Sequence, residues 1–145
     1  MYKKILIPTD GSNLSDSAVR HGLDLAAEFR AEVVVLTVTT PFHILALDPA
    51  MISDTAADYE KRVSSHAAAL LEQARSAAAA KHVKCETVHV ERDHPYEAII
   101  QIAAAKGCDV ILMASHGRRG AAAVILGSET VKVLTHSKVP VIVYR

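Results

Sequence analysis

Residues 3–12, KKILIPTDGS, decide the fold of this chain. Three apolar residues, Ile5 to Ile7, stand between two lysines and the turn-forming residues Pro8 to Ser12. A short run of this kind, bounded by polar and turn residues, predicts a buried strand that ends in a turn. The residues that follow change to the apolar spacing of a helix. Together they predict one βα unit.

The same alternation of strand and helix continues along the chain. Five apolar segments predict strands, namely Lys3–Pro8, Glu32–Val38, Lys84–Val90, Val110–Ala114 and Val139–Tyr144. Helical stripes lie between them, made of Ala18, Val19, Gly22, Leu23 and Ala26 in one segment and Ile99, Ile102 and Ala103 in another. Alternating units with such apolar strands need right-handed crossovers, which predicts a doubly wound α/β fold with a parallel sheet and helices on both faces.

Helix boundaries are indicated by residues that cap the first turn or permit a left-handed exit. The expected boundary residues are Ser12 or Ser15 for the first helix, Ser53 for the second, Asp93 or His94 before Pro95 for the third, and Gly107 for the exit of the third. The second helix is expected from about Thr55 to Ala80, where two alanine runs have high helix propensity.

Length and composition exclude several classes of protein. The 145 residues are 50% hydrophobic, which predicts a single domain over residues 1–145. Lysine plus arginine equals aspartate plus glutamate at 16 each, so no overall field attracts nucleic acid or an anionic membrane. The apolar runs are too short to cross a bilayer or to serve as a signal peptide, so we expect a cytoplasmic protein. Cys85 and Cys108 are expected to be free thiols.

In a doubly wound sheet the ligand crevice lies outside the carboxyl ends of the strands, where neighbouring connections leave in opposite directions. The segments to inspect are therefore Pro8–Ser12, Val38–Thr40 and Ala114–Glu129. The irregular loop Pro41–Ile52 could fold over that crevice.

The strongest local signal is MASHGRRG at residues 113–120, followed by LGSE at residues 126–129, where a helix is expected to begin. Glycines let backbone N–H groups approach phosphate oxygens, and a helix N-terminus adds its dipole and the Ser128 hydroxyl. The pattern predicts an anion cradle, although a plain βα turn has the same composition. Arg118 and Arg119 fit either solvated loop charges or phosphate contacts.

From Tyr2 to Tyr144 the chain resembles the universal stress proteins. The opening residues 3–12 look like that family's first strand and turn, and SKVPVIV at residues 137–143 looks like its last strand. The resemblance implies a Rossmann-like, five-stranded sheet of order 3-2-1-4-5. It also implies an adenine-nucleotide (ATP) binding, stress-response regulatory protein that forms a homodimer.

In ATP-binding members a glycine-rich sequence pattern lines the nucleotide. It consists of a glycine, two residues, a second glycine, nine residues, and then glycine followed by serine or threonine. Gly117, nine residues, Gly127 and Ser128 keep the second half of that pattern. Three positions before Gly117 the chain has Ala114, where the pattern has glycine. The added methyl group could narrow the site or weaken binding.

The resemblance implies a site in which Asp10 lies near the adenosine, the Val38 backbone contacts the base, and Gly117, Gly127, Ser128 and Glu129 surround the phosphates. The full set of expected binding residues is Pro8, Thr9, Asp10, Val38, Ala114, His116, Gly117, Arg118, Gly127, Ser128 and Glu129. The expected ligand is ATP, with Mg²⁺ as the cation that could accompany its phosphates. Asp10 also fits a simple turn residue.

Two other functions remain open. One is a dimeric stress scaffold without nucleotide, if Ala114 closes the site. The other is an enzyme, which is disfavoured because the chain lacks a P-loop, paired histidines after the first strand and clustered acidic residues there. Ser115, His116 and Asp10 are not expected to form a catalytic triad, because adjacent loop residues rarely reach each other productively. The eight histidines show no convincing zinc spacing, so neither catalytic nor metal-binding residues are expected.

The last expected strand, Val139–Tyr144, is apolar at nearly every position and ends the sheet. An uncovered edge of this kind tends to pair with another chain, and two copies of one strand related by a two-fold axis pair antiparallel. The sequence therefore predicts a homodimer through this strand.

Overall fold

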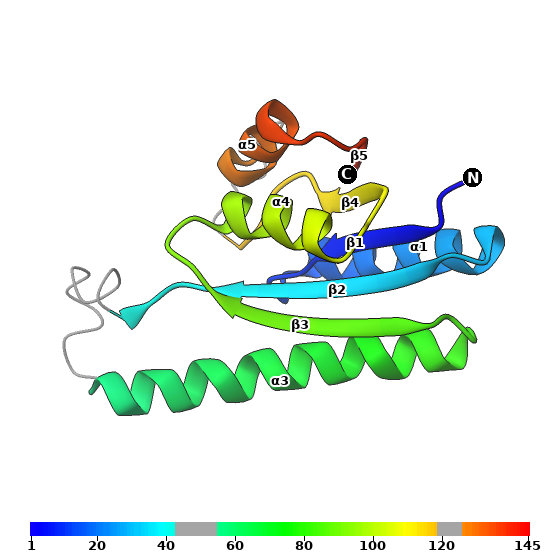
Figure 1. The fold of residues 1–145 in the computed structure, drawn as a ribbon. Coiled ribbons are helices and arrows are strands. Elements are labelled where there is room, and N and C mark those ends of the chain that lie inside the picture. The colour runs from blue at the N-terminus through cyan, green and yellow to red at the C-terminus, as the bar shows by residue number, and fades with distance from the viewer. Residues whose placement is uncertain (43–54, 119–125) are drawn as a thin grey trace.

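Five strands form one parallel sheet in the computed structural model, which describes residues 1–42, 55–118 and 126–145. Their bounds are β1 Lys4–Pro8, β2 Glu32–Thr39, β3 Cys85–Glu91, β4 Val110–Ala114 and β5 Val141–Tyr144. The strand order is β3-β2-β1-β4-β5 and every neighbouring pair is parallel (Figure 1). The predicted doubly wound α/β fold and its strand order are confirmed.

Helices cover both faces of the sheet (Figure 1). Their bounds are α1 Asn13–Phe29, α3 Ala56–Ala80, α4 Pro95–Ala105 and α5 Ser128–His136. Leu23 of α1 and Leu71 of α3 belong to one core cluster, and Ile99 of α4 and Val133 of α5 belong to a second cluster on the opposite face. None of the helices in the described parts of the chain is both long and apolar enough to cross a membrane.

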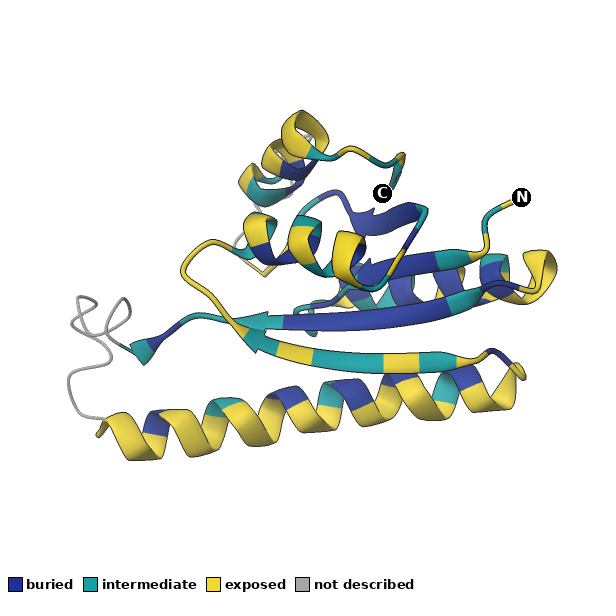
Figure 2. Cartoon of the chain, viewed as in Figure 1, coloured by how far each residue is buried: buried dark blue, intermediate teal, exposed yellow. Residues whose placement is uncertain are grey.

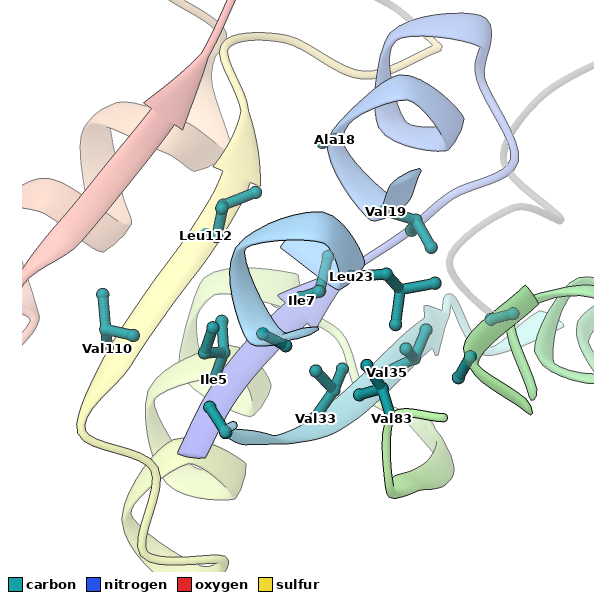
Figure 3. Packing of buried hydrophobic residues seen from close by; sticks show 14 of the residues in the cluster. Ile5, Ile7, Ala18, Val19, Leu23, Val33, Val35, Val83, Val110 and Leu112 are labelled. Carbon is teal, nitrogen blue, oxygen red and sulfur yellow. The ribbon is translucent and has the colours of Figure 1, made fainter. Parts of the chain in front are cut away.

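The first core cluster shows why the strand sequences are apolar at successive positions. Alternate residues of β1, such as Ile5 and Ile7, point toward α1, where Leu23 packs against the sheet (Figure 3). Leu6, between them, belongs to the cluster on the other face. Because the strand is buried on both faces, it needs apolar residues at odd and even positions alike.

The central strands β1, β2 and β4 are buried, whereas β3 and β5 at the two edges are partly exposed (Figure 2). All four residues of β5 are half-buried, and β4 is the neighbour to which the strand is hydrogen-bonded. The prediction that the last strand lies at an edge of the sheet is therefore confirmed.

The predicted bounds of β5 were wrong at its start. The strand begins at Val141 and not at Val139. The Ser137 hydroxyl donates to the carbonyl of Val139 and accepts from its N–H, which folds these residues into a turn. Pro140 has no N–H to donate, so the ladder begins with its carbonyl, which accepts from Ile111. Strands β1 and β3 each begin one residue later than predicted, and β2 and β3 each end one residue later.

The helix caps follow local chemistry with one correction. Ser12, one of the two predicted candidates, caps α1 by accepting from the N–H of Ser15. Thr55 caps α3 by accepting from the N–H of Asp58, and the predicted cap Ser53 lies outside the described residues. Gly107 has a φ of +65° and provides the predicted exit from α4.

The strand order creates a switch point between β1 and β4. The chain leaves β1 toward α1 on one face and leaves β4 toward α5 on the other. The two connections therefore diverge, which opens a crevice at the carboxyl ends of these neighbouring strands.

Candidate functional site

A cavity of about 830 Å³ opens at the carboxyl ends of β1, β2 and β4, at the switch point. Its volume falls in the range of small-molecule sites. All of the residues predicted for the site line this cavity: Pro8, Thr9, Asp10, Val38, Ala114, His116, Gly117, Arg118, Gly127, Ser128 and Glu129. The fold thus brings together residues from separate segments of the chain.

The Asp10 carboxylate connects two loops of the cavity. Its Oδ1 accepts a 3.0 Å hydrogen bond from the N–H of Ser12, and its Oδ2 accepts a 2.9 Å bond from the N–H of Arg118. Burial by itself raises the pKa of this carboxyl, but hydrogen bonds from Ser12 and Arg118 outweigh burial and hold the pKa below its ordinary value. Asp10 therefore stabilises the loop after β4 in addition to forming its own turn.

Gly117 is required by close packing. A Cβ atom at this position would collide with Oδ2 of Asp10. Among the described glycines, positive φ angles occur at Gly11 and Gly107, so the backbone conformation of Gly117 does not itself require glycine. The absence of a side chain lets the backbone after β4 lie directly against the Asp10 carboxylate.

Gly127 brings the start of α5 against the same loop. Its N–H donates a 2.6 Å hydrogen bond to the carbonyl of Ser115, and a Cβ would lie 3.1 Å from the Cα of His116. As the N-cap, Gly127 has no side chain to cap the first N–H groups of α5. The Thr130 hydroxyl donates to the carbonyl of Ala114 at 3.0 Å, which fixes α5 to the end of β4. The first turn of α5 therefore offers N–H donors at the cavity.

The Glu129 side chain has a partner on another helix. Its Oε2 accepts a 2.8 Å hydrogen bond from the N–H of Tyr96 in the first turn of α4, and its Oε1 lies 3.3 Å from Nζ of Lys132. His94, the N-cap of α4, makes no side-chain capping bond, so Glu129 caps this helix from α5. The sequence indicated Glu129 only as part of the phosphate loop, because nothing local to it shows that α4 lies within reach.

Ser115 and His116 contact each other through their side chains. Ser115 Oγ and His116 Nδ1 are 3.2 Å apart. Ser115 is nevertheless 3% exposed and does not line the cavity, and the Asp10 oxygens bond to backbone groups instead of to His116. The contact therefore does not present a nucleophile to a ligand.

One wall of the cavity was not predicted from the sequence. It is formed by the first half of α3, through Tyr59, Val63, His66, Ala67 and Leu70. These residues recur at helical spacing, and that signal was interpreted only as packing on the sheet. At about 1.5 Å for each of its 25 residues, α3 is longer than the strands beside it. Its first turns therefore extend past the carboxyl ends of these strands (Figure 1).

Contacts from α3 reach both neighbouring loops. The Tyr59 hydroxyl donates to the carbonyl of Thr40 at 2.7 Å, which holds the end of β2. His66 Nε2 lies 3.1 Å from Nη2 of Arg118, so α3 also contacts the loop after β4. The predicted loop residues Arg119 and Gly120 and most of Pro41–Ile52 lie outside the described residues.

The fold and the cavity define a Rossmann-like α/β protein with a pocket of small-molecule size at its topological switch point. The sequence profile of the universal stress protein family matches residues 1–145. The chain belongs to the universal stress protein family.

Named relatives agree with this assignment. The universal stress protein MJ0531 of Methanocaldococcus jannaschii is 31% identical over 145 residues, which cover 100% of this chain and 83% of the relative. The universal stress protein YxiE of Bacillus subtilis is 30% identical, with both chains covered completely. The solved structure of the protein MJ0577 is 29% identical, covers 99% of this chain and 96% of its own, and superimposes with a TM-score of 0.83.

Proposed function

We propose that this protein is an adenine-nucleotide binding, stress-response regulator whose ligand is ATP. The observation that carries the proposal is the convergence of Asp10, Gly117, Gly127 and Ser128 on one cavity at the switch point of the sheet. The backbone at Gly117 and the uncapped first turn of α5 supply N–H donors, which are the groups that bind phosphate oxygens.

The adenosine would lie on the side of the cavity formed by Asp10 and Val38, and the phosphates would lie at Gly117, Gly127 and Ser128. Ser128 would add one hydroxyl donor to the backbone N–H groups. In the described parts of the chain, no three acidic, histidine or cysteine side chains are grouped to hold a metal ion. We therefore expect any Mg²⁺ to be bound mainly by the phosphates, as is usual for this ion.

Other family members have been solved with adenine nucleotides. One universal stress protein has been crystallised in complex with cAMP, and one from Archaeoglobus fulgidus with dAMP. They are 23% and 16% identical to this chain, so they establish the shared fold alone. The nucleotide assignment for this chain rests on the geometry of its own cavity.

We further propose that residues 1–145 act as one domain in the cytoplasm, as a homodimer formed through β5 and as a binding protein without catalytic activity. The edge position of β5 supports the dimer, because within the described ranges no strand lies beside its outer backbone groups. Antiparallel pairing of β5 with its copy would close the assembly at two chains.

The second candidate is a dimeric stress scaffold that holds no nucleotide. Ala114 favours it, because this residue lines the cavity at a place where the nucleotide-binding pattern has glycine. The substitution Ala114→Gly separates the two candidates. If the methyl group only narrows a working site, the variant binds ATP as well as the parent or better. If the methyl group closes the site, ATP binds to Ala114→Gly and does not bind to the parent protein.

Mass spectrometry of the gently purified protein tests the proposal by detecting a co-purified nucleotide. A thermal melt with and without millimolar ATP and Mg²⁺ tests it independently, because a ligand present at 100 times its Kd stabilises the folded state by about 2.7 kcal/mol. We expect a higher Tm for the parent and no shift for Gly117→Val. The absence of any shift in the parent would favour the scaffold.

A further inference from the structure

Carboxylates outnumber permanent cations among the described residues that line the cavity. Among the described residues that line it, the carboxylates are Asp10, Asp93 and Glu129, and the permanent cation is Arg118. The two backbone N–H donors on Asp10 offset part of its charge. A phosphate chain entering this cavity therefore meets carboxylate charge as well as N–H donors.

Glu129 is the carboxylate beside the expected phosphate position. It follows Ser128 in the first turn of α5, and its Oε2 accepts from the N–H of Tyr96 in the first turn of α4. An acceptor position at the start of α4, where a phosphate oxygen could bind, is thus filled by the protein's own carboxylate. The nearby Lys132 is exposed and lies outside the cavity, so it offsets the charge of Glu129 only weakly.

We propose that Glu129 makes this pocket select nucleotides by the charge on their phosphate chain, so that AMP binds more tightly than free ATP. This inference rests on the proposed adenine-nucleotide site. Each added phosphate brings further negative charge toward Glu129, and repulsion rises with that charge. Mg²⁺ bound to the triphosphate removes most of the difference, because it neutralises charge on the phosphates.

The test compares AMP and ATP by isothermal titration, in chelator and in Mg²⁺, for the parent protein and for Glu129→Gln. The glutamine keeps an oxygen that can accept from Tyr96 and removes the charge. We expect Glu129→Gln to bind Mg²⁺-free ATP about tenfold more tightly, equivalent to ~1.4 kcal/mol, and AMP at most about twofold more tightly. The effect of Mg²⁺ on ATP affinity should shrink in this variant.

Glu97→Gln is the matched control. Glu97 also lies in the first turn of α4 and its Oε1 is 3.2 Å from the Tyr96 hydroxyl, but it does not line the cavity. This control makes the same change in net charge, and we expect it to leave the ratio of ATP to AMP affinity at the parental value. A change equal to that of Glu129→Gln would show a general charge effect and overturn the assignment to Glu129.

Two further results separate the possible failures. If the parent in chelator binds ATP at least as tightly as AMP, the charge selection is wrong, whether or not Glu129→Gln folds. Equal gains for AMP and ATP in Glu129→Gln would likewise overturn it while leaving the nucleotide site in place. If no adenine nucleotide binds to the parent, the proposed function fails and this inference fails with it.

Discussion

The backbone N–H of Arg118 donates a 2.9 Å hydrogen bond to Oδ2 of Asp10, across 108 residues of sequence. This bond joins the turn after β1 to the loop after β4, the two loops on either side of the switch point. Since Gly117 precedes the donor, the close approach of these loops depends on a residue without a side chain.

Gly117→Ala should disturb this contact, because the new Cβ would collide with the Asp10 carboxylate. We expect a loss of about 1–3 kcal/mol in the free energy of unfolding, measured with urea, together with weaker ATP binding. Gly107→Ala is the control. It should cost about 1 kcal/mol through its positive φ without changing ATP affinity, since a Cβ there has no neighbour within 4 Å. Parental stability and ATP affinity in Gly117→Ala would contradict the packing argument.

Asp10→Asn should make the free energy of unfolding less dependent on pH in the acidic range. The folded-state pKa of Asp10 lies below its ordinary value, so its ionised form stabilises the protein above the unfolded pKa of about 3.9, and this contribution is lost as the pH falls through the lower folded value. We expect Asp10→Asn to cost about 1.5 kcal/mol at pH 7, by urea unfolding, because it weakens hydrogen bonds to a charged group.

The gap in stability between the parent and Asp10→Asn should narrow as the pH is lowered below about 3.9. A gap that stays constant or widens on acidification would mean that the charge of Asp10 does not support the two loops.

Ser128→Ala should weaken ATP binding, since it removes one hydroxyl donor to a charged phosphate, worth about 1.5–3 kcal/mol. Gly117→Val should weaken it further, because its branched side chain enters the space held by the Asp10 carboxylate. Isothermal titration of the parent and both variants measures the order. Equal affinity in all three proteins would place the ligand elsewhere.

Val143→Lys should lower the fraction of protein that forms the dimer, or lower the solubility of the protein. Ile142 packs with the core cluster on the α1 face, so a charge there would also destabilise the monomer, whereas Val143 belongs to neither core cluster. Light scattering at micromolar concentration should give twice the 15.5 kDa chain mass for the parent and a lower mass for the variant. His89→Lys on β3, an exposed residue at the opposite edge that belongs to neither core cluster, should leave the mass unchanged. A monomeric parent would refute pairing through β5.

The sequence by itself determined the order and type of the elements. Apolar runs such as Ile5 to Ile7, followed by turn residues and a helical stripe, depend on interactions between residues close in the chain. The same local chemistry indicated the capping role of Ser12 and the exit at Gly107. Because these features need no knowledge of distant segments, they could be predicted from local sequence. The individual residues expected around the crevice came from the resemblance to the family.

Only the tertiary structure decided which side chains meet there. The contact between Asp10 and Arg118, the capping of α4 by Glu129 and the wall contributed by His66 all join segments far apart in the sequence. Whether such groups touch depends on strand order, on the length of α3 relative to the sheet and on the faces that the helices cover. The spacing of residues in the sequence does not predict these quantities directly, because they arise when separate βα units pack around a shared core.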